Sequence, residues 1–480
     1  MSKEKIDRRP GWRLAAVVSF SLLLSGCFFA GTPIRKVSLP NPPNQVLAPR
    51  DHQRILASYS GAYSDRNLEA FLARIVSRLA AASDKPELRY KVTILNSPAV
   101  NALALPNGQL YVTRGLVALA NDTSELASVL SHEMAHVLAR HAVTREAHAY
   151  QATLNRAANN PMSDPYLGAL ARAKSKIALA TFSRAQEFEA DSIGIGISAR
   201  AGFDPDGAVR FLASLDSNTH LGPSGGTSDP QFLDFISHPA TPERIGNALA
   251  SARQQRAAAG GERDREAYLA AVEGLIFGDD PNQGFVRGRR YMHPKFGFTF
   301  TAPEGFVLEN TAQAVLGLKD GGRQALRLDV VRVPTEQPLA EYIATGWLDG
   351  VDPGMEEVIV NGFPAVTATA QSDDWSYRIY VVRFGVEVYR LVFAAKEKSP
   401  EVDRAFRESF STFRHLRLSE IETAKPLRLA VVTVGADDTV ERLAGRMAIV
   451  DRPLEHFRVL NSLTPGDTVK PGDRIKIVVE

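Results

Sequence analysis

Apolar and polar positions recur with a helical period over much of residues 51–277, which predicts a mostly helical region. Residues 68–82 show this spacing clearly. Asp122 precedes Glu125 in the arrangement of a capping box, and an apolar pattern without proline or glycine follows. We therefore expect a long helix that begins after Asp122 and continues to about residue 148.

Strand-like patterns occur within this helical region. Residues 89–95 alternate apolar and polar side chains, and two short apolar runs, 102–105 and 110–112, flank Asn107 and Gly108. An Asn-Gly pair between apolar runs is typical of a tight hairpin turn. The sequence thus predicts a few strands with a hairpin among the helices.

The pattern changes after about residue 290, where strand-like runs predominate. Strands are expected at residues 325–333, 377–384 and 386–393, and a closing helix at 405–413. Residues 290–420 are therefore predicted to form a separate α+β domain with an antiparallel sheet. Its opening FGFTFTAPEGF and its closing strand–helix pattern resemble the PsbP-like fold.

The last segment, residues 428–480, contains DDTVERLAGRM, FRVLNSL and VKPGDRIKIV. These stretches are similar to LysM repeats, small βααβ modules that bind N-acetylglucosamine polymers. The matching positions are mostly core and turn positions, so two alternatives stay open. The module binds peptidoglycan, or it packs on its own protein and binds no glycan.

Length and composition agree with a multidomain globular protein. A chain of 480 residues corresponds to about three domains at a prior of roughly 150 residues each. The formal net charge of +2 gives no concentrated basic surface, so we expect no nucleic-acid partner. No stretch beyond the N-terminal segment approaches the roughly 20 apolar residues that a membrane-spanning helix needs.

The N-terminus has the pattern of a targeting segment. Basic residues precede a short apolar run at residues 14–24, which ends in Leu-Ser-Gly-Cys. This sequence resembles a bacterial lipobox, and Cys27 is the only cysteine of the chain. We expect residues 1–27 to be a lipoprotein signal peptide with Cys27 lipidated, and residues 28–50 to be a tether. The alternative is an ordinary signal peptide or a short anchor. The absence of an acidic residue after Cys27 favours the outer membrane, facing the periplasm.

The strongest chemical signal is SHEMAH at residues 131–136, within the predicted long helix. Residues four apart lie on one helix face, so His132 and His136 can bind one metal ion, and Glu133 lies close enough to act as a general base. Two imidazoles and a further protein ligand would suit one Zn²⁺ per chain. The alternative is a helix with two unrelated surface histidines. His141 and His148 follow on the same helix and are interpreted as structural or solvent-facing.

A second stretch makes a family resemblance specific. SHEMAHVLARH followed by SRAQEFEADSIGI resembles the HtpX/BepA-like minigluzincin zinc metalloproteases, the HExxH family that includes the CAAX prenyl endoprotease. The resemblance implies that Glu187 is the third zinc ligand and that Asp191, one helical turn on, orients a ligand histidine. Glu189 is the less favoured alternative ligand, because it points to another side of the helix.

Two more stretches match this family. NALALPNGQLYVTRGL resembles the family's edge strand and hairpin, so Ala102, Leu103, Ala104 and Leu105 are expected to form an edge strand on which an extended substrate pairs.

The second of these stretches, SHPATPERI, resembles the family's His-Pro segment, which implies that His238 lies near the metal and Arg244 near its ligands. His238 is either a ligand that holds the enzyme latent or a structural loop histidine.

The sequence therefore predicts an α+β multidomain protein with a zincin-type peptidase domain, residues 51–277, and two accessory domains. Its expected function is that of a zinc metalloendopeptidase of the cell envelope that degrades misfolded or misassembled envelope proteins. Two alternatives stay open, a peptidoglycan stem-peptide hydrolase and a chaperone or assembly factor with a latent site. Substrate identity, cleavage preference and oligomeric state are not predicted.

Overall fold

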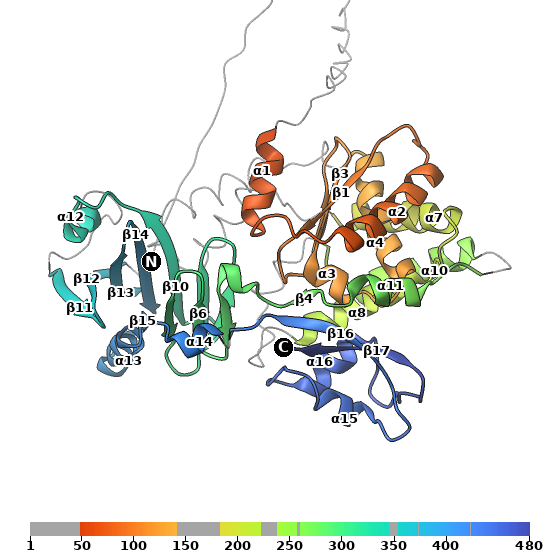
Figure 1. Cartoon of the computed structure of the whole chain (residues 1–480). Helices are drawn as coiled ribbons and strands as arrows, with labels where there is room; N and C mark the ends of the chain where they lie inside the picture. Colours follow the sequence, from red (N-terminus) through yellow and green to blue (C-terminus); the bar gives the residue numbers. More distant parts are fainter. Residues whose placement is uncertain are drawn as a thin grey trace, which may run out of the picture. The chain divides into compact units, whose positions relative to one another are not determined.

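The structure is a computed structural model that describes residues 49–141, 183–221, 238–256, 260–344, 354–372, 374–422 and 424–480 (Figure 1). The predicted signal peptide with Cys27, almost all of the predicted tether, and His148 lie outside these ranges, so these predictions stay predictions. Among the helices of the described residues, none is long and apolar enough to cross a membrane.

The predicted helical region is confirmed, and α4 is its central helix. Asp65 caps α2 by accepting hydrogen bonds from the N–H groups of Asn67 and Leu68, and the apolar side of α2 is buried. α4 contacts α2, α7 and α8. The helices are α1 (Pro49–Ser58), α2 (Arg66–Ala82), α3 (Arg114–Leu119), α4 (Thr123–Leu138), α7 (Arg184–Arg200), α8 (Gly207–Leu221), α10 (Pro242–Gln255) and α11 (Arg265–Val272).

α4 begins where the sequence predicts but ends earlier. The Asp122 carboxylate accepts a hydrogen bond from Glu125 N at 2.9 Å, as expected for an N-cap. The prediction of a helix continuing to about residue 148 is wrong, because α4 ends at Leu138 and Arg140 adopts a left-handed backbone with φ 55°. The chain turns back at this point, which places His141 against the helix end.

A small sheet lies beside these helices, with strand order β1-β3-β2. β1 (Lys91–Leu95) pairs in parallel with β3 (Gln109–Thr113), and β2 (Ala102–Ala104) pairs antiparallel with β3. The predicted turn between β2 and β3 is confirmed, and Gly108 is required there. Its φ is +85°, and a Cβ atom would lie 2.2 Å from the carbonyl oxygen of Arg89. β2 therefore lies at an edge of this sheet.

The predicted α+β region with antiparallel pairing is also confirmed. Its strands form a seven-stranded sheet of order β11-β12-β13-β14-β10-β9-β8 and a four-stranded sheet of order β15-β7-β6-β5. The strands are β5 (Phe285–Arg287), β6 (Arg290–His293), β7 (Phe298–Thr301), β8 (Val307–Asn310), β9 (Val315–Lys319), β10 (Gln324–Arg332), β11 (Glu356–Val360), β12 (Phe363–Gln371), β13 (Ser376–Phe384), β14 (Glu387–Ala395) and β15 (Arg414–His415). The helical elements are η1 (Pro281–Gln283), α12 (Leu339–Ala344), α13 (Pro400–Ser411) and α14 (Leu418–Glu422).

The C-terminal segment has the βααβ order expected from its sequence. It consists of β16 (Leu427–Thr433), α15 (Val440–Ala444), α16 (Pro453–Leu460) and β17 (Arg474–Val479). β16 pairs with β17 and also with β4 (Ile276–Phe277), which follows the helical region. The apolar side chains of this module belong to the same core cluster as those of α2 and α4. Its LysM identity stays a prediction.

Lys476 of β17 connects this module to the start of α4. Its side chain is fully buried, and its ammonium donates hydrogen bonds to the carbonyl oxygens of Ala118 (2.7 Å) and Ala120 and to the Tyr268 hydroxyl (3.0 Å). Ala118 and Ala120 lie at the C-terminal end of α3, where a cation is favourable. Burial raises the pKa of Glu125, in the first turn of α4, to about 7, and Lys476 counteracts this shift.

Replacing Lys476 by Met is expected to lower the free energy of unfolding by about 3 kcal/mol, because buried oxygen acceptors lose their donor. Chemical denaturation followed by circular dichroism would measure the change. Lys470→Met is the matched control, since Lys470 lies in the same module and is exposed. Equal stability of the two variants would contradict this role of Lys476.

Candidate active site

α4 places His132, Glu133 and His136 inside the protein. All three side chains are buried, and the Nε2 atoms of His132 and His136 lie 3.0 Å apart. This closeness follows from the spacing of four residues, which brings both rings to one helix face. The helix thus presents two imidazoles to one point, with a buried carboxylate beside them.

α7 supplies the acidic residues that face this point. The helix starts with a capping box formed by Ser183 and Gln186, so that Glu187 lies in its first turn and Asp191 one turn further on. Gly194, three residues beyond Asp191, lies against α4, where a Cβ atom would be 2.9 Å from the backbone nitrogen of His132. The absence of a side chain at Gly194 therefore lets the two helices approach closely.

Four side chains form a cluster that could hold one metal ion: His132, His136, Glu187 and His238. Glu187 Oε2 lies 3.5 Å from His132 Nε2, and Glu187 Oε1 lies 3.7 Å from His136 Nε2. Neighbouring ligands around a tetrahedral zinc ion with bonds of about 2.1 Å are about 3.4 Å apart, so these separations suit a single ion. Imidazole nitrogen and carboxylate oxygen are also donors that zinc accepts.

The charge states of the cluster favour metal binding. Burial lowers the pKa of His136, and the neighbouring rings of His132 and His238 lower it further, so His136 is held neutral. Burial alone would raise the pKa of Glu187, but the hydrogen bond from His238 and the charge of Arg244 outweigh it and keep the carboxylate ionised. Glu187 Oε2 accepts no well-aligned hydrogen bond from the described residues, and its ion-pair partner is Arg244 Nη1 at 3.0 Å.

Arg244 and Asp191 lie behind the cluster. Thr241 caps α10 by accepting a hydrogen bond from Arg244 N, with Pro242 at the helix start. The Arg244 guanidinium donates from Nε and Nη2 to the two oxygens of Asp191, at 2.6 and 2.8 Å. Asp191 Oδ1 in turn lies 2.9 Å from His132 Nδ1, which is the contact expected for a residue that orients a ligand histidine.

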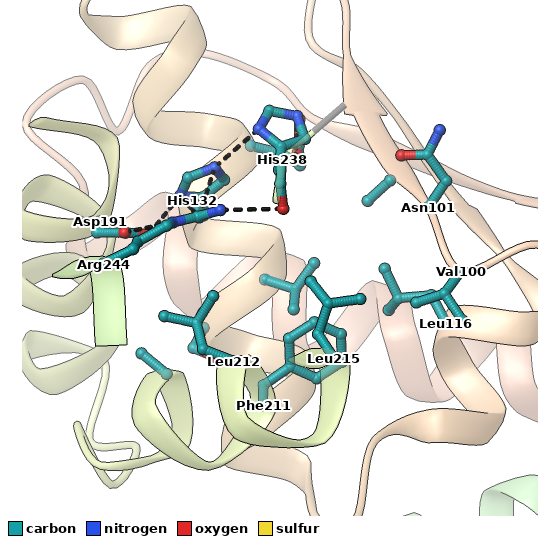
Figure 2. A pocket seen from close by; sticks show the side chains of 15 residues that line it. Val100, Asn101, Leu116, His132, Asp191, Phe211, Leu212, Leu215, His238 and Arg244 are labelled. Carbon is teal, nitrogen blue, oxygen red and sulfur yellow. Dashed lines mark hydrogen bonds and ion pairs between the residues drawn. The ribbon is translucent and has the colours of Figure 1, made fainter. Parts of the chain in front are cut away.

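Figure 2 shows His238 and Asp191 on either side of His132. His238 Nδ1 is 2.8 Å from Glu187 Oε1 and 3.3 Å from His132 Nε2, and its Nε2 is 3.5 Å from Glu133 Oε1. Its backbone carbonyl accepts a hydrogen bond from Arg244 Nη1. A single histidine thus contacts two of the candidate ligands, Glu187 and His132, and the candidate base Glu133.

A pocket opens beside His132 and Glu133. Figure 2 shows its apolar floor, formed by Phe211, Leu212 and Leu215 of α8. Asn101 and Ala102, at the start of the edge strand β2, line the same pocket. The edge strand and the cluster therefore border one cavity.

The structure brings together the site residues predicted on α4, α7 and the His-Pro segment, and it places Ala102 at their pocket. Two features were missed. His141 was interpreted as structural or solvent-facing, yet its Nδ1 lies 2.9 Å from His136 Nδ1. The residues of α8 carry no motif, and only their helical apolar pattern could have indicated a buried face.

A helix with His-Glu-x-x-His, a carboxylate from a second helix, and a neighbouring edge strand and pocket together define a metallopeptidase of the zincin type.

Comparisons with known proteins agree with this class. Residues 66–252 match peptidase family M48. The mitochondrial metalloendopeptidase OMA1 of Schizosaccharomyces pombe is 30% identical over 249 residues, which are 50% of this chain and 71% of that protein. The beta-barrel assembly-enhancing protease of Yersinia pestis is 28% identical over 205 residues, 40% of each chain. The chain therefore belongs to peptidase family M48 and is a metalloprotease.

A solved structure gives a weaker likeness. The solution structure of cyanobacterial PsbP from Synechocystis sp. PCC 6803 is 15% identical, with a TM-score of 0.21, and covers 27% of this chain and 91% of that chain. A likeness of this size carries no argument, so the PsbP-like identity of residues 290–420 stays a prediction.

Gly194→Ala is expected to weaken Zn²⁺ binding and to lower the melting temperature, because the added methyl group would overlap the backbone of His132 and push α7 from α4. Calorimetric titration with Zn²⁺ and a thermal scan would measure both effects.

Gly196→Ala is the control on the same helix, since its Cβ would meet only the end of the Arg200 side chain, at 3.4 Å. Alanine is favoured over glycine in a helix by about 1 kcal/mol, so this variant should be neutral or more stable. Zinc binding by Gly194→Ala as tight as that of Gly196→Ala would contradict the close-packing argument.

Proposed function

We propose that this chain is a zinc-dependent endopeptidase in which His132, His136 and Glu187 hold one zinc ion and Glu133 is the general base. The buried cluster of two imidazoles and a carboxylate next to Glu133 carries this proposal. When bound, zinc would act as a Lewis acid that polarises the scissile carbonyl and makes water more acidic.

Glu133 would move the proton in this reaction. It lies one residue from His132 on the same helix turn and lines the pocket where a substrate would lie. A carboxylate there can take a proton from the attacking water and return it to the leaving amine, which general acid–base catalysis requires. Burial excludes bulk water and strengthens the electrostatic interactions of this carboxylate.

The surroundings of the site support an extended polypeptide as substrate. β2 is an edge strand whose residues 101 and 102 border the pocket, so a substrate backbone could pair along Ala102, Leu103 and Ala104 and on to Leu105. The floor of Phe211, Leu212 and Leu215 suits a large apolar side chain next to the scissile bond. Unfolded proteins expose such side chains in extended segments.

The soluble form that starts after Cys27 is expected to hold about one zinc ion per chain and to cleave casein. Glu133→Gln should retain zinc and lose cleavage by about 10²- to 10⁴-fold, because the proton acceptor is gone. Glu187→Ala should bind zinc more weakly. Metal analysis and a peptide-release assay would measure these outcomes.

The control for this experiment is Glu69→Gln, the same change on the exposed side of α2. Purified sacculi assayed in parallel separate the alternatives. Cleavage of sacculi instead of casein would favour the peptidoglycan hydrolase, and bound zinc without any cleavage would favour the chaperone or assembly factor. A chain that binds no zinc would remove the proposal.

His238 is proposed to hold the enzyme latent. It lies 3.3 Å from His132 and close to Glu133, so it occupies the space that water and the substrate carbonyl need. If displacing His238 costs the reaction about 1.4 kcal/mol, its removal corresponds to a tenfold gain in rate. His238→Ala is therefore expected to raise kcat/KM on casein up to about tenfold. His220→Ala on exposed α8 surface is the control. An alanine variant no more active than the wild type would leave His238 as a structural residue.

The proposed setting is the cell envelope, with misfolded or misassembled envelope proteins as substrates. The lipobox at Cys27 supports a lipid anchor in the outer membrane, and the related protease of Yersinia pestis is named for assembly of β-barrels. The C-terminal module would bring the enzyme to peptidoglycan if it binds glycan.

A further inference from the structure

His132 and His136 differ in the residue that contacts Nδ1, the ring nitrogen that faces away from the cluster. His132 Nδ1 contacts Asp191, which Arg244 fixes with two hydrogen bonds. Within the described residues, another imidazole lies beside His136 Nδ1. This neighbour of His136 Nδ1 is Nδ1 of His141, at 2.9 Å.

His141 reaches His136 only because α4 ends early. In a continuous helix, residues five apart are about 140° apart around the axis, and their side chains do not meet. Here Arg140 adopts φ 55°, and the backbone N–H of His141 donates to the carbonyl oxygen of His136 at 3.0 Å. The chain reversal leaves the His141 ring buried, edge-on to His136 with centroids 4.9 Å apart.

The other nitrogen of His141 is also partnered. Its Nε2 lies 3.3 Å from Oε2 of Glu189, a residue of α7. The Glu189 side chain is 59% exposed, so this outer contact is screened by water and weaker than the inner one. Three residues thus form a chain of contacts from solvent to the cluster: Glu189, His141 and His136.

A neutral imidazole carries a proton on only one of its two nitrogens. This determines which atom donates in each hydrogen bond of this chain of contacts. If His136 Nε2 binds the metal, its proton is on Nδ1, and Nδ1 donates to His141 Nδ1. The proton of His141 is then on Nε2, which donates to Glu189. We propose that His141, supported by Glu189, is a positioning residue that sets the tautomer and ring orientation of His136 as a metal ligand. This inference rests on the proposed zinc site.

His141 is not itself a member of the cluster that could hold the ion among the described residues. Its action therefore passes through His136. Loss of such an outer hydrogen bond typically weakens metal binding by about 10- to 100-fold, which sets the size of the expected effect.

The test compares three variants by chelator competition for Zn²⁺ and by the visible spectrum of the Co²⁺-loaded protein. His141→Phe keeps a ring but removes the acceptor, so zinc should bind about 10- to 100-fold more weakly with an altered cobalt spectrum. His141→Asn places an oxygen near the position of Nδ1 and should recover most of the affinity. Glu189→Gln should have the smallest effect.

The melting temperatures of the metal-free variants separate positioning from folding. Equal affinity and an unchanged spectrum in His141→Phe would overturn this inference while the zinc site stands. Equally weak binding by Phe and Asn variants, with equally lowered melting temperatures, would also overturn it, because the role would then be structural. A wild-type chain without zinc would instead overturn the proposed function, and this inference with it.

Discussion

The close packing of α4 against α7 is the constraint on which the site depends. Packed helices usually lie about 8–10 Å apart, and short carboxylate side chains cannot bridge a wide gap between them. Gly194 removes the side chain at the contact, where a Cβ would lie 2.9 Å from His132 N. Glu187 then lies near the rings of His132 and His136, and Asp191 contacts that of His132. One residue without a side chain therefore makes the ligand distances possible.

Charge balance is the second requirement, because buried charges are costly unless they are paired. Arg244 balances the charge of the two buried carboxylates of α7. It binds Asp191 with two nitrogens and lies 3.0 Å from Glu187. The same guanidinium holds the backbone carbonyl of His238. A displacement of His238 would therefore disturb the residue that balances the acidic pair.

Local patterns of the sequence predicted the parts of the site that lie on one helix. The spacing of His132 and His136 determines that they share a face, and the Asp122 cap marks where α4 begins. The prediction of Glu187 as a ligand required a family resemblance, because no local rule pairs it with histidines about 50 positions earlier. The solvent-facing alternative for His141 was wrong, since the ring is buried. The helix end at Leu138 could not be foreseen because it carries no glycine or proline, and the turn is made by Arg140 in a conformation that arginine seldom adopts.

The fold was predictable where its periodicity is strong, as in α2 and in the antiparallel strands after residue 290. The burial of Lys476 was not predictable, because the alternating pattern of its strand predicts a solvent-facing lysine. Its environment comes from α3 and Tyr268, which lie far away in the sequence. The sequence left open whether the C-terminal module packs on its own protein, and the structure shows that it shares one core with the helices.

This shared core gives the C-terminal module a role that needs no glycan. Asn121, immediately before the cap of α4, donates a hydrogen bond to Ser462 of the module at 2.6 Å, and Lys476 binds the carbonyls that end α3. The N-terminal end of α4 is thus held by the module, which shares its core with the helices. The turn of α4 that carries His132 and His136 follows this anchored end, as a preorganised metal site would require.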